Sequence, residues 1–164
     1  MTQVTDRIEK TVHLNAPREQ AWRAIIEPEQ FGRWFGVRFE EGPFEVGTLT
    51  VGWITPTTVD PEVAKMQKPY EGKPFEIVVE RIEEMKRFAF RWHPGAVEPG
   101  IDYSKEAMTL VEFGLEDESL GTRLTITESG FDALPEPRRT PAFTGNEAGW
   151  EHQVHLLEKY LARR

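Results

Sequence analysis

The sequence contains no cysteine among its 164 residues. This absence excludes disulfide bonds, thiolate metal sites and cysteine nucleophiles, and it is compatible with a reducing compartment. The sequence also lacks any apolar segment close to the roughly 20 residues that a membrane-spanning helix needs, and its N-terminal segment MTQVTDRIEK is polar. We therefore expect a cytoplasmic protein without a signal peptide or a membrane anchor.

Clusters of basic residues are absent as well. The 20 Lys and Arg residues are scattered among 28 Asp and Glu residues, which gives a formal net charge of -8 and a pI near 5.1. Binding to nucleic acid or to an anionic membrane requires a basic stripe that neutralises phosphate groups. We therefore expect neither nucleic acid nor a membrane among the partners.

Aromatic residues, in contrast, are plentiful: 10 Phe, 5 Trp and 3 Tyr are spread along the whole chain. The length suits one ordinary domain with one core, and the sequence shows no internal repeat and no linker. We therefore expect a single domain over residues 1–164 whose aromatic residues cover a large apolar surface.

A hydrophobic period of two predicts a sheet. RIEKTVHL alternates, which places Ile8, Val12 and Leu14 on one face of a first strand and His13 on the wet face. Further strands are expected near residues 37–41, 46–54, 73–84, 86–93, 107–117 and 120–129. The short links EEMKR and EDESLGT are typical of antiparallel hairpins. The long links at 55–73 and 94–106 are rich in proline, and we expect loops that lie over one end of the sheet.

The alternation also assigns the two faces of this sheet. The inward set is apolar and aromatic: Leu49, Val51 and Trp53; Phe88, Phe90 and Trp92; Thr109, Val111, Phe113 and Leu115; Thr122, Leu124 and Ile126. The alternate positions are polar: Arg87, Arg91, Glu112, Glu116, Arg123, Thr125 and Thr127. One face is therefore expected to need a cover, and the other to face water.

Three helices are expected. The first follows a cap at Asn15 and ends at Pro28, and the second ends at Gly36. A C-terminal helix of about twenty residues carries an apolar stripe, and it is long enough to cover the sheet. The stripe consists of Phe143, Trp150, Val154, Leu157 and Leu161.

The opposite side of the C-terminal helix carries His152 and His155. On a helical wheel both lie far from the apolar stripe, so we interpret this HxxH pair as a solvent-exposed face and assign no metal site to it.

A helix that covers an aromatic sheet leaves a crevice between the two layers, which is a candidate ligand pocket. The walls predicted from the face assignment are Trp53, Phe90, Trp92, Phe113 and Trp150. Asn146, Glu147 and Gln153 flank Trp150, where they either orient a ligand or form a border in contact with water. Whether the crevice is open or filled by these aromatic side chains stays open at this stage.

Four segments resemble a known family: LNAPREQAWRAIIEPEQFGRWF, EGKPFEIVVERIEEMKRFAFRW, TLVEFGLEDESLGTRLTITESGF and AGWEHQVHLLEKYL. They are similar to the activator of heat-shock-protein-ninety ATPase homologue (AHSA-like) family, within the START-like (SRPBCC) superfamily. The most specific pieces are Trp34 and Phe35, the strand Gly121 to Thr127, and the pair Gly149 and Trp150.

The resemblance covers residues 8–163 and implies an α+β helix-grip fold. In this fold a curved six- to seven-stranded antiparallel sheet wraps around a long C-terminal helix, with two short helices after the first strand. The resemblance transfers no catalytic residue and no cofactor. It leaves a chaperone partner unsupported, because nothing in the chain corresponds to the separate N-terminal domain that carries the main chaperone contacts of the eukaryotic co-chaperone.

The first functional hypothesis is a protein that binds a small apolar or aromatic ligand between the sheet and the C-terminal helix. The predicted ligand-binding residues are Trp34, Trp53, Phe90, Trp92, Phe113, Glu147 and Trp150. An alternative is an enzyme of the cyclase or hydrolase type, with Glu147 or His93 as general base. A third hypothesis is a chaperone-associated or other interaction module, or a homodimer that pairs through open strand edges. An exposed apolar patch would support it, but the charged alternation on the wet face argues against one.

Overall fold

The computed structural model of the chain describes residues 6–95 and 102–162. These residues form one seven-stranded sheet in the order β1-β7-β6-β5-β4-β3-β2, in which all neighbours are antiparallel. The strands are β1 (Arg7–Leu14), β2 (Val37–Phe39), β3 (Leu49–Ile54), β4 (Pro74–Glu83), β5 (Arg87–Trp92), β6 (Thr109–Glu118) and β7 (Gly121–Ser129). The helices are α1 (Arg18–Ile26), α2 (Pro28–Phe35), α3 (Pro61–Gln67) and α4 (Glu136–Ala162), with 3-10 turns η1 (Lys68–Tyr70) and η2 (Phe131–Ala133).

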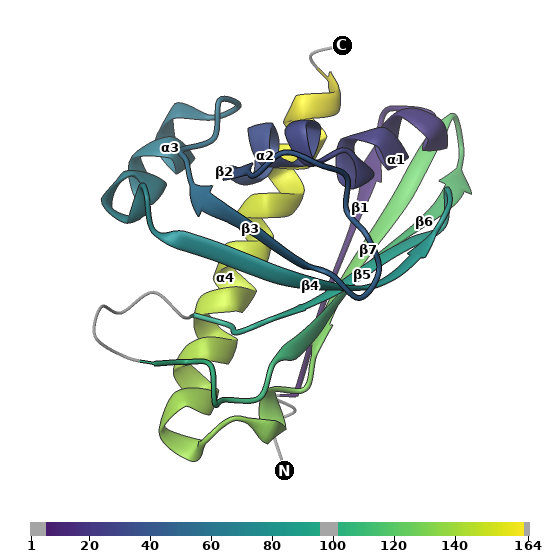
Figure 1. Cartoon of the computed structure of the whole chain (residues 1–164). Coiled ribbons are helices and arrows are strands. Elements are labelled where there is room, and N and C mark those ends of the chain that lie inside the picture. The colour runs from purple at the N-terminus through teal and green to yellow at the C-terminus, as the bar shows by residue number, and fades with distance from the viewer. Residues whose placement is uncertain (1–5, 96–101, 163–164) are drawn as a thin grey trace.

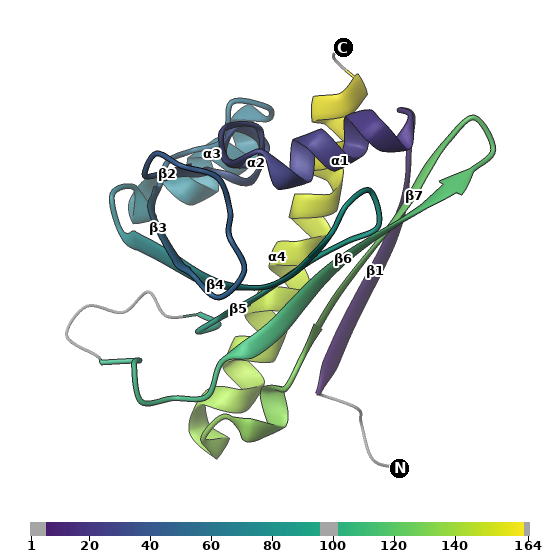
Figure 2. The same ribbon diagram turned by 45° about the vertical axis from the view of Figure 1, so that its right-hand side comes forward.

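The sheet curves around the long helix α4, as Figures 1 and 2 show. α1 and α2 lie at the end of the sheet near the C-terminal half of α4, and α4 contacts β1, α2 and α1. After β1, the chain crosses to the opposite edge of the sheet and returns strand by strand from β2 to β7. The predicted helix-grip fold is therefore confirmed. None of the described helices combines the length and the apolar character that a membrane span needs.

The predicted hairpins are present. The β4–β5 link includes Met85 at a φ of 69°, and the β6–β7 link includes Leu120 at a φ of 64°, so both turns use the left-handed region. Gly36, with a φ of 100°, ends α2 as predicted. Residues 96–101 of the second long link lie outside the described residues.

Two local predictions are wrong. The link at 55–73 is not a plain loop, because it contains α3: the Asp60 carboxylate accepts hydrogen bonds from the N–H groups of Glu62 and Val63, and Pro61 occupies the first turn. α1 begins at Arg18 after Pro17, without a side-chain cap, so Asn15 is not the cap. α4 is also longer than expected, at 27 residues.

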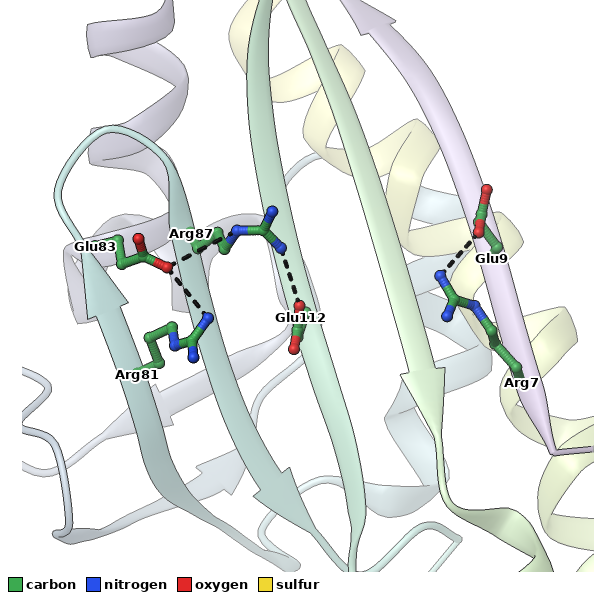
Figure 3. Close-up of polar contacts among 6 residues, drawn as sticks. All are labelled: Arg7, Glu9, Arg81, Glu83, Arg87 and Glu112. Carbon is green, nitrogen blue, oxygen red and sulfur yellow. Dashed lines mark hydrogen bonds and ion pairs between the residues drawn. The ribbon is translucent and has the colours of Figure 1, made fainter.

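The face assignment is confirmed for β5, β6 and β7. Their inward residues are buried, apart from the half-buried Trp92, whereas the alternate positions carry ion pairs such as Arg87 with Glu112 and Arg123 with Glu116. Figure 3 shows the outer face, where Arg81 and Arg87 also meet Glu83. Each of these pairs contributes little to stability because it is exposed to solvent.

The face assignment is wrong for β3. Trp53 is 41% exposed and Leu49 is 50% exposed, and Trp53 pairs with the exposed Pro74 on the outer side. The inner side of β3 carries Gly52 instead, and a Cβ there would lie 3.0 Å from the Phe39 ring and 2.6 Å from the Arg38 carbonyl oxygen. Because β2 already fills this space, β3 needs no large inward side chain, and its apolar residues lie outside.

Ion pairs hold α4 at both flanks. Lys10 of β1 reaches Glu151 at 3.3 Å, and Lys159 reaches Asp60 at the start of α3. The Lys10 ammonium lowers the pKa of Glu151, and the Lys159 ammonium lowers the pKa of Asp60. α4 is therefore tied to the sheet edge on one side and to α3 on the other.

Candidate functional site

Glu128 is the one charged residue among the buried residues of the described chain, and its exposed fraction is 0%. It lies in β7 at the inward position two residues beyond Ile126, opposite Ile8 of β1 and Val111 of β6. A buried carboxylate is costly unless hydrogen bonds replace its hydration, so its surroundings decide what it can do.

Four side chains donate to this carboxylate. Oε1 accepts from the indole N–H of Trp150 at 2.8 Å and from Asn146 at 2.9 Å. Oε2 accepts from the indole N–H of Trp92 at 2.7 Å, from the Thr109 hydroxyl at 2.5 Å and from Asn146 at 3.0 Å. Indole and amide N–H groups can only donate, and the Thr109 hydroxyl can donate or accept, so the set is compatible with an ionised carboxylate, which can only accept. We call these five residues the Glu128 cluster.

The fold brings this cluster together from four elements. β5, β6 and β7 are neighbours in the sheet, and their register places Trp92 directly opposite Thr109. Asn146 and Trp150 are four residues apart in α4, so they lie on the same side of the helix, one turn apart. The cluster therefore joins the centre of the sheet to the long helix.

The charge of Glu128 has no cationic partner. Within residues 6–95 and 102–162, no Lys, Arg or His side chain forms an ion pair with it, and all its hydrogen-bond donors are neutral. Its acceptor positions are occupied by these donors, so in this arrangement it has no free lone pair with which to take a proton from a substrate. The cluster places a negative charge inside the protein but does not place a general base.

Aromatic rings surround the Glu128 cluster. Trp92 stacks on Trp150 with ring centroids 5.7 Å apart, and Phe75 meets Trp92 edge-on at 5.7 Å. Phe35 contacts Trp150 at 6.0 Å, and Phe113 contacts it at 5.8 Å. The layer between the sheet and α4 is thus packed with rings in mutual contact.

This aromatic layer reaches the surface along one flank of α4. Phe75, Trp92, Asn146, Gly149 and Gln153 are all partly exposed there, and we call these residues the α4 edge. A Cβ added at Gly149 would meet no atom within 4 Å, so the space beside the helix is open at this point.

Gln153 contributes a side-chain amide to the α4 edge. Its side-chain N–H donates to the carbonyl oxygen of Phe35 at 3.0 Å, which fixes the orientation of the amide because a carbonyl can only accept. Its own Oε1 is buried and has no hydrogen-bond partner. The edge therefore combines aromatic rings, open space and one unused acceptor.

The structure separates the predicted ligand-binding residues into three groups. Trp34, Phe90 and Phe113 are 0% exposed and Trp150 is 2% exposed, all in the packed layer, and Trp92 is half-buried at its edge. Trp53 lies on the outer face of the sheet, and Glu147 is exposed on α4.

The three histidines considered as candidate site residues differ in burial. His93 is half-buried at the end of β5, and its Nδ1 is buried without a hydrogen-bond partner. His152 and His155 are exposed, as predicted, and His155 contacts Glu151 and Glu158. Among the described residues, no group of three or more His, Asp or Glu side chains has an arrangement that could hold a metal ion.

A shallow depression of about 620 Å³ lies on the outer face of the sheet, far from α4. It is lined largely by charged residues, and several of them pair with one another, such as Arg87 with Glu112 at 3.3 Å and Arg18 with Asp117 at 3.4 Å. Because most of these charged groups form exposed ion pairs and the depression is open to water, we prefer the α4 edge as the candidate site, although Arg18 Nε is buried there without a hydrogen-bond partner.

Sequence reasoning missed Glu128, although the alternation contained a signal for it. Thr122, Leu124 and Ile126 define the inward face of β7, and the same period of two places Glu128 on that face. A charged residue at a core position conflicts with the pattern of a simple strand and therefore suggests a special role.

Comparisons with known proteins agree with this fold. A sequence profile of the family described as Activator of Hsp90 ATPase homolog 1-like protein matches residues 15–162, so the resemblance seen in the sequence is confirmed. No protein with a curated description matches the chain.

Three solved structures illustrate the likeness. DynU16, a protein in the dynemicin biosynthetic locus, is 25% identical with a TM-score of 0.66; the match covers 96% of this chain but 47% of that one, so this chain spans about half of its length. MLL2253 of Mesorhizobium loti is 22% identical with a TM-score of 0.68, covering 96% and 97% of the two chains. A protein of Arthrobacter aurescens is 19% identical with a TM-score of 0.73, covering 98% and 88%. The last two show the shared fold alone.

Proposed function

We propose that this chain, which belongs to the Activator of Hsp90 ATPase homolog 1-like protein family, binds a small aromatic or mainly apolar molecule at the α4 edge. The observation that carries the proposal is the open space beside Gly149, on the same side of α4 as Asn146 and Gln153, which contact Glu128 and Phe35. The proposal moves the predicted site from the centre of the crevice, which side chains fill, to the place where the aromatic layer meets solvent.

The geometry of α4 supports this placement. Asn146 and Gln153 stand three residues before and four residues after Gly149, so all three share one side of the helix. Asn146 contacts Glu128 and Gln153 contacts Phe35, so this side faces the rings of Trp92 and Phe35. A ligand there would gain about 25 cal/mol for each Å² of apolar surface removed from water.

The similarity to DynU16 favours a small molecule as the ligand, because that protein is described as part of a biosynthetic locus. Its identity of 25% and the coverage of about half its length leave the ligand itself to be found by experiment.

The proposal is tested with naphthalene-based probes of similar size. Binding next to Trp92 and Trp150 should quench tryptophan emission with a stoichiometry near one. Gly149→Leu should block binding, because the new side chain would fill the open space. Gly145→Leu is the matched control: a Cβ there also meets no atom within 4 Å, and Gly145 is exposed one turn before Gly149, so its side chain would lean toward the N-terminal end of α4.

Both substitutions replace a helical glycine, so both should raise stability by up to about 1 kcal/mol. Loss of binding in Gly149→Leu alone would support the α4 edge. Equal binding by wild type and Gly149→Leu would contradict it, as would the absence of binding by every probe in the series.

A homodimer is the second candidate, and one observation favours it. Leu49 and Trp53 form an exposed apolar stripe on the outer face of β3, a feature that the charged alternation argued against. Sedimentation of wild type and Trp53→Lys distinguishes the cases: a dimer that the substitution dissociates would support this surface, and a wild-type monomer at high concentration would exclude a homodimer.

A further inference from the structure

We infer that the α4 edge selects an organic cation with N–H donors over neutral or anionic molecules of the same shape. This inference rests on the proposed binding function and assigns the chemical class of its ligand. Three features of the site lead to it: the buried carboxylate of Glu128, the partly exposed rings of Trp92 and Phe75, and the acceptor on Gln153 that has no partner.

The first feature is the uncompensated charge of Glu128. Its partners are four neutral donors, which satisfy its hydrogen bonds but leave its net charge in place. Charges interact over longer distances in a protein interior than in water, because the effective dielectric constant there is lower. A cation at the α4 edge would be attracted by this charge through the ring of Trp92, without displacing any donor.

Two cations close to α4 are engaged elsewhere. Lys10 pairs with Glu151 on the opposite flank of α4. Arg138 contacts Glu106 at 3.1 Å and donates to the carbonyl oxygen of Pro94, and its guanidinium lies over the ring of Tyr103. The described part of the chain therefore places no cation of its own against the Glu128 cluster.

The second feature is the pair of rings at the edge. Trp92 and Phe75 are partly exposed and meet edge to face with an interplanar angle of 83°. The face of an aromatic ring carries negative electrostatic potential, so exposed rings attract a cation and repel an anion. The rings and the carboxylate therefore favour the same sign of charge.

The third feature is the carbonyl oxygen of Gln153. A buried acceptor without a partner costs free energy, and a ligand N–H would remove this cost once a small rotation of the half-buried Gln153 side chain turns this oxygen toward the edge. Gln153 is seven residues beyond Asn146, which is about 10 Å along the helix. A two-ring aromatic amine is shorter than this distance, so its ring and its charged N–H groups both fit along the edge.

The test is a series of three naphthalene probes that differ in charge. These are 1-naphthylmethylammonium, 1-naphthylmethanol and 1-naphthoate, measured by tryptophan quenching and calorimetry near 0.15 M salt, where surface charges are screened beyond about 8 Å. The cation should bind on the order of tenfold more tightly than the alcohol, and the carboxylate should bind most weakly.

Two variants with the same change in net charge locate the source of this preference. Glu128→Gln should bring the affinity for the cation close to that for the alcohol. Glu147→Gln removes an exposed carboxylate one residue from Asn146 and should leave the preference unchanged. If Glu128→Gln does not fold, Phe75→Leu serves instead, because it removes a ring face outside the Glu128 cluster and should weaken cation binding more than alcohol binding.

The outcomes separate this inference from the proposed function. If the alcohol binds to wild type as tightly as the cation, the inference is wrong although the binding function stands. If Glu128→Gln keeps the full preference, or Glu147→Gln abolishes it, the buried carboxylate is not its source and the inference is again wrong. If no probe binds, the proposed function itself fails.

Discussion

Trp92 of the sheet and Trp150 of the long helix stack with ring planes 29° apart, and their two indole N–H groups donate to different oxygens of one buried carboxylate, that of Glu128. Two tryptophans therefore share a single acceptor group across the interface between sheet and helix. This relationship explains why the aromatic layer can contain indole donors without leaving them unsatisfied, and it fixes the rotation of α4 on the sheet.

Removal of the shared acceptor should be strongly destabilising. Glu128→Ala would leave the N–H groups of Trp92 and Trp150 and the Asn146 amide buried without an acceptor, and it would open a space in the core. We expect a loss of about 3–5 kcal/mol in the free energy of unfolding, measured by urea denaturation. Glu147→Ala, an exposed change on α4, should alter it by less than about 0.5 kcal/mol. Similar values for the two variants would contradict a structural role for the cluster.

Much of the fold can be predicted from the sequence, because a sheet with one solvent-exposed face requires polar and apolar residues to alternate along its strands. The charged positions of β5 and β6, such as Arg87 and Glu112, alternate with buried residues and face solvent as expected. The prediction fails in β3, where the apolar alternation is real but Phe39 of β2 already fills the inner side. Only the pairing of β2 with β3 reveals which face is free.

The candidate site is harder to predict for a related reason. Glu128 can be placed on the inner face by its position after Ile126, but its donors come from residues 92, 109, 146 and 150, which only the tertiary fold brings together. The open space beside Gly149 has no signal in the sequence either, because a glycine in a helix does not indicate whether atoms of other elements lie close to it.

Substitution of two tryptophans should lower the free energy of unfolding to very different extents. Trp34 is 0% exposed and donates to the carbonyl oxygen of Ala24 at 2.8 Å, so Trp34→Ala should cost about 3–5 kcal/mol. Trp53 is 41% exposed on the outer face, so Trp53→Ala should cost less than about 1 kcal/mol. Thermal or urea unfolding of both variants checks this, and a large cost at Trp53 would show that it packs inward after all.

The exposed histidines of α4 should be dispensable. His152 is exposed to solvent, and His155 is exposed and contacts Glu151 and Glu158 of the same helix. Replacement of both by alanine should change the free energy of unfolding by less than about 0.5 kcal/mol. A zinc titration provides the critical comparison: if zinc raised the melting temperature of wild type but not of the double variant, the pair would bind metal.

The ion pair between Asp60 and Lys159 should make the attachment of α3 to α4 depend on pH. The Lys159 ammonium lowers the pKa of Asp60 below its ordinary value of 3.8 in the folded protein, and the N–H groups that Asp60 caps act in the same direction. A carboxyl group with a lowered folded pKa stabilises the protein fully above the unfolded value and loses this contribution as the pH falls through the folded one.

Asp60→Asn isolates the charge, because an asparagine side chain can still accept hydrogen bonds from the first turn of α3. Wild type should therefore be more stable than Asp60→Asn at pH 7 and pH 5, and the difference should shrink as the pH falls below 3.8. Melting temperatures of both proteins across this range provide the measurement, and the other carboxyl groups cancel because both chains share them. A difference that stays constant down to the lowest pH at which both proteins fold would mean that the charge of Asp60 does not hold α3 against α4.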